Sequence, residues 1–139
     1  MSYEEKGVWV YLVVSLGAYG VYLAVILGRA DGVPLSEVAY VPPMLWSIGI
    51  AVAATVVGRV AVEIVRPSES HRSDPRDKEI NRFGEYVAGV VFAVVMVVPL
   101  GLAMAEADHF WIANAMYTAF VLAALVGSGV KLVAYRRGL

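Results

Sequence analysis

The sequence predicts an all-α protein, a four-helix transmembrane bundle in up-down-up-down order, and two observations lead to this prediction. First, the 139-residue chain is 60% hydrophobic and only 17% charged, whereas soluble domains are about half apolar and about a quarter charged. Second, the charged residues gather at the chain ends and in the connecting segments, which leaves four long apolar stretches. Residues 1–139 are therefore expected to form a single integral membrane domain.

The four apolar stretches are predicted to be the membrane spans. Each is 20 or 21 residues long and contains no Asp, Glu, Lys, Arg or His; they are residues 8–27, 38–58, 86–105 and 110–130. At a rise of about 1.5 Å per residue, a helix of this length crosses a hydrocarbon core of roughly 30 Å. We expect helices despite the many valines, because backbone groups in lipid must be satisfied within the segment and strand-like alternation is absent.

The basic residues predict the orientation of the spans. Ten of the 11 Lys and Arg residues lie near the two termini or around the loop between the second and third spans, and only Arg29 lies on the other side. Loops rich in Lys and Arg stay in the cytoplasm. Both termini and the central loop are therefore predicted to be cytoplasmic, in a multi-pass protein of the cell membrane.

The two halves of the chain show a weak similarity. The first span runs into Gly28-Arg29-Ala30-Asp31 and the third into Ala105-Glu106-Ala107-Asp108, and a shift of 77 residues aligns Gly7 with Gly84. This pattern is typical of a parallel pseudo-repeat of two helical hairpins. Chance similarity between Val-, Ala- and Gly-rich helices is the alternative.

The central loop, residues 66–82, carries the most distinctive local pattern. Asp74 is a predicted helix N-cap, followed by Pro75 at the first helical position and Asp77 at the third. The helix that begins at residue 75 is expected to continue into the third span. The candidate partner-binding residues are Asp74, Arg76, Asp77 and Arg82. The alternative is a solvated helix extension whose charges pair with one another and only set the topology.

The segment Ser73-Asp74-Pro75-Arg76-Asp77-Lys78-Glu79-Ile80 resembles the central loop of uncharacterised small four-span prokaryotic membrane proteins, which reads Ser-Asp-Glu-Arg-Asp-x-x-Ile. The chain departs from that pattern at Pro75, where the family usually has Glu. About eight residues carry the motif, although the four-span layout covers the whole chain. The resemblance implies no particular activity.

Four charged residues are predicted near the cytoplasmic ends of the spans. Arg59 and Glu63 are spaced by one helical turn, and Glu85 and Lys131 lie at the corresponding ends of the third and fourth spans. One hypothesis joins these four side chains into a charged ring at the cytoplasmic mouth, because ionisable groups within a membrane often have functional roles. The alternative is local pairing and snorkelling to the interface.

Polar side chains within the spans form a second candidate region. The first span carries Tyr11, Ser15, Tyr19 and Tyr22 along one face, and Asn114 and Thr118 share a face of the fourth. A tyrosine near the midplane needs a hydrogen-bond partner. Candidate partners on other spans are Ser47, Thr55, Asn114 and Thr118. These residues are interpreted either as a cavity for a lipophilic ligand or as polar contacts between helices.

Several function classes are disfavoured. The chain has no cysteine, no Asp, Glu or His cluster with metal-ligand spacing and no phosphate-binding glycine loop. The central loop is short and partly acidic, which argues against nucleic-acid binding. No acid lies deep in a span, which argues against a proton-coupled exporter. We therefore expect no cofactor, no metal and no nucleic acid.

The leading functional hypothesis is a non-enzymatic scaffold, accessory or regulatory subunit that acts through helix contacts and its charged loop. Membrane lipids and a homo-oligomer or another membrane protein are the expected partners. A small channel, a transporter or a binder of a lipophilic ligand is the second hypothesis. A membrane-embedded enzyme is the third, and it would need scattered loop residues such as His71, Asp74 and Asp77.

Overall fold

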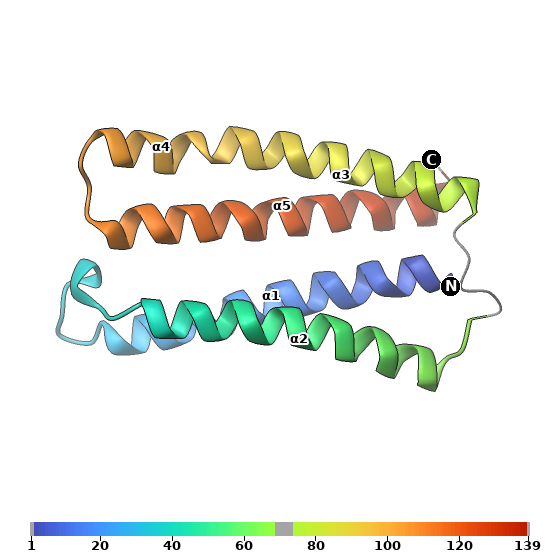
Figure 1. Ribbon diagram of the computed structural model, residues 1–139, viewed down its shortest axis with the longest axis horizontal. Coiled ribbons are helices and arrows are strands. Elements are labelled where there is room, and N and C mark those ends of the chain that lie inside the picture. The colour runs from blue at the N-terminus through green and yellow to red at the C-terminus, as the bar shows by residue number, and fades with distance from the viewer. Residues whose placement is uncertain (1, 69–73, 139) are drawn as a thin grey trace.

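The computed structural model describes residues 2–68 and 74–138 and confirms an all-helical four-span bundle (Figure 1). In chain order the elements are α1 (Tyr3–Arg29), the short 3-10 helix η1 (Leu35–Glu37), α2 (Val41–Val65), α3 (Pro75–Val95), α4 (Val97–Met104) and α5 (His109–Arg137). The third span combines α3 and α4. All four spans are long and apolar enough to cross a membrane.

The helices are longer than the apolar stretches, with 27, 25, 30 and 29 residues in the four spans. Most of these helices continue beyond the apolar stretch into the flanking charged residues. Caps and ion pairs can stabilise these helix ends. The second helix begins at Val41, not at residue 38, with proline at its start. Proline is suited to the first helical turn because its missing N–H would have had no partner there.

The third span is interrupted at Met96, between α3 and α4. Pro99 causes the break, because it lacks the N–H that would donate to the carbonyl of Val95, four residues earlier. The helix resumes at once, and the N–H of Leu100 donates to the carbonyl of Met96 at 3.2 Å. The interruption therefore lies in the half of the third span nearer to the 105–108 connection.

The spans lie in a row in the order α2, α1, α5, α3 (Figure 1). The contacts follow this order, since α1 packs against both α2 and α5, and α5 also packs against α3 and α4. Both termini and the start of α3 lie at one end, here called the basic end. The connections 30–40 and 105–108 lie at the opposite end, here called the loop end.

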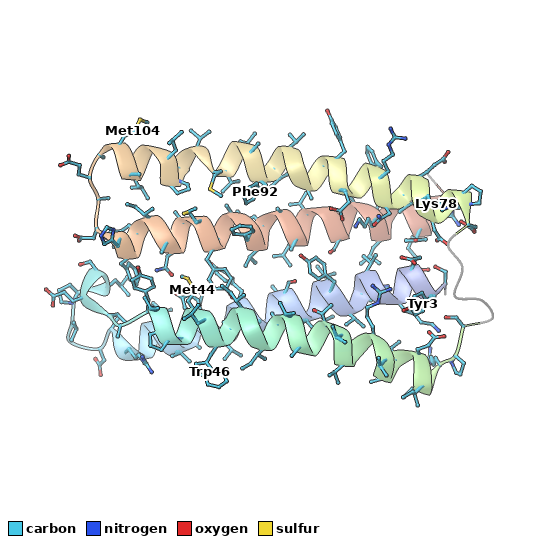
Figure 2. All side chains as sticks on the ribbon, in the orientation of Figure 1. Tyr3, Met44, Trp46, Lys78, Phe92 and Met104 are labelled. Carbon is cyan, nitrogen blue, oxygen red and sulfur yellow. The ribbon has the colours of Figure 1, made fainter. Side chains whose placement is uncertain are left out.

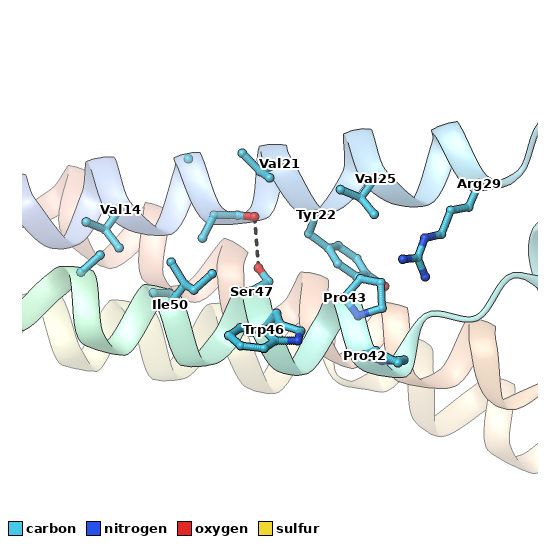
Figure 3. Close-up of a pocket in the computed structure, with 14 residues that line it drawn as sticks. Val14, Val21, Tyr22, Val25, Arg29, Pro42, Pro43, Trp46, Ser47 and Ile50 are labelled. Carbon is cyan, nitrogen blue, oxygen red and sulfur yellow. Dashed lines mark hydrogen bonds between the residues drawn. The ribbon is translucent and has the colours of Figure 1, made fainter.

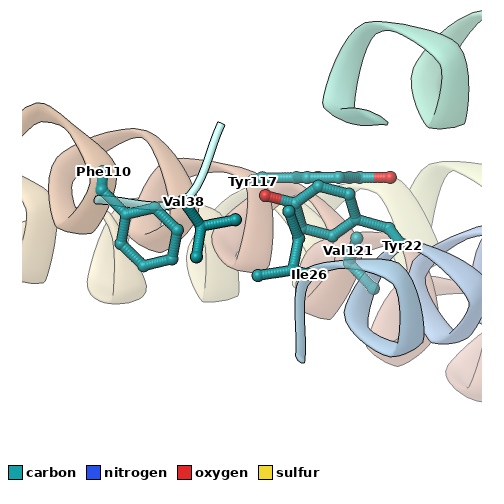
Figure 4. Close-up of a cluster of buried hydrophobic side chains, with 6 residues drawn as sticks. All are labelled: Tyr22, Ile26, Val38, Phe110, Tyr117 and Val121. Atoms are coloured by element: carbon teal, nitrogen blue, oxygen red, sulfur yellow. The ribbon is translucent and has the colours of Figure 1, made fainter. Parts of the chain in front are cut away.

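One cluster of buried apolar side chains joins α1, α5 and the 30–40 connection (Figure 4). They are Tyr22, Ile26, Val38, Phe110, Tyr117 and Val121. By contrast, many large apolar side chains cover the outer surface, and Trp46 is 72% exposed and points away from the bundle (Figure 2). Such an exterior is expected for a protein whose surroundings are lipid, because lipid tails are as apolar as leucine.

Candidate functional site

Three tyrosine rings from two helices meet inside the bundle. Tyr19 and Tyr22 project from α1, and Tyr117 projects from α5. The ring centroid of Tyr117 lies 5.4 Å from that of Tyr19, edge-on, and 5.1 Å from that of Tyr22. These separations fall within the range of favourable aromatic pairs.

Each of the three hydroxyl groups bonds to a polar side chain on another helix. The Tyr19 hydroxyl lies 2.7 Å from the Thr118 hydroxyl, and the Tyr22 hydroxyl donates to the amide oxygen of Asn114. The Tyr117 hydroxyl lies 2.5 Å from the hydroxyl of Ser47 on α2. The six residues of this tyrosine cluster are Tyr19, Tyr22, Ser47, Asn114, Tyr117 and Thr118.

The partners of the tyrosines are held in turn by backbone carbonyls. The Ser47 hydroxyl donates to the carbonyl of Ala18 at 3.1 Å, and the Thr118 hydroxyl donates to the carbonyl of Asn114 at 2.8 Å. A hydroxyl has one proton, so Ser47 and Thr118 then accept from their tyrosines. Within residues 2–68 and 74–138, every buried side-chain N or O atom has a hydrogen-bond partner. The tyrosine cluster therefore links α1, α2 and α5, which supports its interpretation as interhelical contact.

The sequence grouped Tyr19, Tyr22, Asn114 and Thr118, and the structure brings these four residues together. Sequence reasoning missed Tyr117, which occupies the centre of the cluster. Its position offered a signal, because Tyr117 lies three residues after Asn114 and therefore close to the same helix face.

Tyr11 and Ser15 lie outside the tyrosine cluster. They line a groove of about 740 Å³ between α1, α2 and α5, here called the α1–α2–α5 groove. Thr55 also lines this groove, and its hydroxyl donates to the carbonyl of Ala51 at 2.8 Å. Tyr117 lines the groove as well. The other lining residues are apolar, among them Met44, Val52 and Phe120. The groove is therefore suited to an apolar chain more than to an ion.

The charged residues of α2 at the basic end contact the start of α1. Lys6 is buried, and its amine lies 3.4 Å from a carboxylate oxygen of Glu63 and 2.8 Å from the Ser68 hydroxyl. It also donates to the carbonyl of Arg66. The Arg59 guanidinium lies over the ring of Tyr3, 5.0 Å from its centroid. These contacts fix the end of α2 to α1, a role for Lys6 that the sequence did not indicate.

The second pair of predicted charged residues joins the other two helices. The Lys131 amine on α5 lies 2.6 Å from a carboxylate oxygen of Glu85 on α3. The four residues of the predicted ring thus divide between two helix pairs, with Glu63 bonded to Lys6 and Glu85 bonded to Lys131. The weaker Glu5–Arg136 contact, at 3.6 Å, joins α1 to α5.

The start of α3 is capped as the sequence predicts and is also fixed to α5. The backbone N–H of Asp77 donates to the Asp74 carboxylate at 2.7 Å, and the N–H of Asp74 donates to the Asp77 carboxylate at 3.2 Å. Asp77 is buried, and it also accepts a hydrogen bond from the Tyr135 hydroxyl at 2.8 Å. Arg76 donates to the carbonyls of Ala134 and Tyr135. The expected N-cap at Asp74 is confirmed, Asp77 completes a capping box with it, and Tyr135 is a further contact that the sequence did not reveal.

The first turns of α3, residues 75–85, are here called the α3 extension. Arg82, the fourth candidate in this region, is exposed there, as are Lys78, Glu79 and Asn81. Ser73 of the resemblance motif and His71 of the enzyme hypothesis lie outside the described residues. Among the residues that the structure describes, no three His, Asp or Glu side chains converge as metal ligands would.

Comparison of the chain with known protein families, with curated proteins and with solved structures finds no match. The membrane-spanning bundle, the tyrosine cluster and the capped start of α3 are therefore the basis for inferring function.

Proposed function

We propose that the protein is a non-enzymatic membrane scaffold, accessory or regulatory subunit that binds a partner protein through its cytoplasmic, basic end. One observation carries the proposal: the α3 extension is held rigidly at its start and presents charged side chains outward. Asp77 and Arg76 fix the extension to α5, whereas Lys78, Glu79 and Arg82 face solvent. An ordered surface of this kind loses little conformational entropy when a partner binds.

The arrangement of the other polar groups supports the same proposal. The tyrosine cluster and the Lys6 contacts use their polar groups in holding helices together. Among the residues that the structure describes, the exposed Lys78, Glu79 and Arg82 of the α3 extension form no such contacts between helices. The cytoplasmic placement of this end is part of the proposal and rests on the ten basic residues that flank it.

The test is photo-crosslinking in the native membrane. A photoreactive amino acid replaces the exposed Asn81, and the same amino acid at the exposed Trp46 in the second span reports contacts with lipid. We expect a discrete protein adduct from position 81 that Arg82→Glu reduces at least several-fold. An adduct of two copies of the chain would indicate a homo-oligomer. Lipid adducts alone, or an adduct that Arg82→Glu leaves unchanged, would contradict the proposal.

The α1–α2–α5 groove favours a second function, binding of a lipophilic ligand within the bundle. Its volume of about 740 Å³ falls within the range of small-molecule sites, and Tyr11, Ser15 and Thr55 add polar groups to an apolar lining. Val52→Trp would fill this groove, because Val52 is exposed and lines it. Val60→Trp is the matched control on an exposed position of α2 that does not line the groove. Loss of a co-purifying ligand in the first variant alone would support this function.

A further inference from the structure

A second groove runs along the opposite side of the α1–α2 pair (Figure 3). This α1–α2 groove has a volume of about 530 Å³, and Ala18 and Ala51 line both it and the α1–α2–α5 groove. The two alanines therefore form the seam between the grooves. The lining of the α1–α2 groove includes Val14, Gly17, Val21, Trp46, Ile50 and Ala54. Its walls are mostly apolar, and Tyr22, Arg29 and Ser47 add polar groups.

The dimensions of the α1–α2 groove match one leaflet of a bilayer. On α2 its lining extends from Pro42, at the loop end, to Ala54. At about 1.5 Å per residue this distance is about 18 Å. Half of a hydrocarbon core of about 30 Å is about 15 Å. The groove thus covers the depth that one acyl chain of the leaflet at the loop end would occupy.

Arg29 lies at the mouth of the groove. It is the last residue of α1, and its side chain reaches toward Pro43 on α2 (Figure 3). One guanidinium nitrogen donates to the carbonyl of Ala39 at 3.2 Å. Within the described ranges, none of the ion pairs involves Arg29. A guanidinium has five N–H donors in a fork that fits a phosphate, so most of its donors are available to a ligand.

The charges around Arg29 differ from those of the basic end. Arg29 is the only Lys or Arg at the loop end, and the loop that follows it carries Asp31 and Glu37. One cation followed along the chain by two acids is complementary to a zwitterionic headgroup, in which a phosphate is followed by an ammonium. A headgroup with net negative charge would be repelled by the acids.

We propose that the α1–α2 groove binds one zwitterionic phospholipid of the leaflet at the loop end. Arg29 binds the phosphate, and one acyl chain lies along Gly17 between α1 and α2. The lipid fills the space beside α2, a helix that contributes little buried surface of its own. This site is independent of the partner surface on α3 and of the α1–α2–α5 groove.

Native mass spectrometry tests the proposal. The protein is reconstituted in nanodiscs that contain equal amounts of phosphatidylethanolamine and phosphatidylglycerol, released gently, and the retained lipids are counted. We expect one retained phosphatidylethanolamine per chain. Arg29→Gln should lower the retained fraction about tenfold, because a neutral amide binds a phosphate less strongly than a guanidinium does. Glutamine keeps N–H donors on a polar side chain, so the variant removes the charge without removing all hydrogen-bonding capacity.

Two glycine variants form a matched pair. Gly17 lines the groove and Gly20 does not, and a Cβ atom added at either position would have no atom within 4 Å. Gly17→Leu should therefore fill the groove and abolish retention without a clash, whereas Gly20→Leu should retain the lipid like the wild type. Equal retention by both variants would overturn the groove as the site. Unchanged retention in Arg29→Gln, or a preference for phosphatidylglycerol, would overturn the headgroup assignment.

Discussion

The two helical hairpins have similar compositions but pack in different ways. In the most apolar 18-residue window of each helix, 33% of α5 is buried, whereas no residue of the α2 window is buried. The hairpins do share one feature at the basic end. Gly7 on α1 receives the Arg59 side chain of α2, and Gly84 on α3 receives the Lys131 side chain of α5. The hairpins therefore begin alike and diverge within the spans.

The difference lies in where small residues meet. In the second hairpin, a Cβ added at Gly127 on α5 would lie 2.8 Å from the Cβ of Ala88 and 3.3 Å from the carbonyl oxygen of Gly84, both on α3. The two backbones therefore approach closely, which is a common basis of helix association in lipid. The α1–α2 pair instead has a groove on each side of its seam. The first hairpin also has one close contact, where a Cβ added at Gly58 on α2 would lie 2.8 Å from a side-chain carbon of Val10 on α1, so the two grooves are what sets this hairpin apart.

The largest expected effect is at the close contact of the second hairpin. Gly127→Val should destabilise the protein by about 1–3 kcal/mol, because overpacking forces α3 and α5 apart. Thermal unfolding in a mild detergent would measure the change. Gly129→Val is the matched control, since a Cβ at Gly129 would have no atom within 4 Å. Equal effects of the two variants would show that the change is one of helix propensity and not of packing.

The sequence predicts the spans well because their constraint is local. Length and the exclusion of charged residues determine the extent of each span. Proline positions add local detail: Pro42 lies in the first turn of α2, Pro75 begins α3, and Pro99 interrupts the third span. Which small residues meet depends instead on helix rotation, which a nearly uniform apolar composition does not specify. Gly17, Gly49 and Gly129 resemble Gly127 in the sequence, yet only Gly127 of these lies against another helix.

The candidate sites show the same limit. Tyr22 and Asn114 could be grouped from the sequence because few polar groups occur in the spans, although the individual hydrogen-bonded pairs could not be assigned. The contacts of Lys6 and Tyr135 could not be predicted, because the basic end offers many charged partners for each. Tertiary packing determines which of these contacts form.

The next effect concerns the bonds that join the two hairpins. Tyr22→Phe should cost about 1 kcal/mol, because it removes the donor to the amide oxygen of the half-buried Asn114 between α1 and α5. Tyr22 is only 2% exposed, so water cannot readily replace the hydroxyl. Tyr11→Phe, at an exposed tyrosine of the same helix, should change the unfolding temperature little. A larger fall in unfolding temperature for Tyr11→Phe than for Tyr22→Phe would contradict the structural role of the tyrosine cluster.

A more local effect is expected at the start of the second hairpin. Asp74→Ala should destabilise the first turn of α3 by about 1 kcal/mol, because it removes the side-chain acceptor for the N–H of Asp77. Hydrogen exchange at the first amides of α3 should accelerate, while exchange in the middle of α5 stays slow. Glu79→Ala is the control on the exposed face of the same helix. Uniform acceleration through the bundle would show that the cap supports the whole fold and not only its own turn.

The smallest effect should come from the ion pair between α3 and α5. The side chain of Glu85 is 68% exposed, whereas that of Glu63 in the first hairpin is 17% exposed beside the buried Lys6. Exposed ion pairs contribute about 0–1 kcal/mol and weaken as salt screens them. Glu85→Gln should therefore shift the unfolding temperature only slightly, and the shift should vanish at high salt.

Lys6→Met should shift the unfolding temperature more than Glu85→Gln does. Salt should not abolish that larger shift, because Lys6 also bonds to Ser68 and to the Arg66 carbonyl. Equal shifts would mean that charge pairing contributes alike to both hairpins, leaving helix packing as the difference between them.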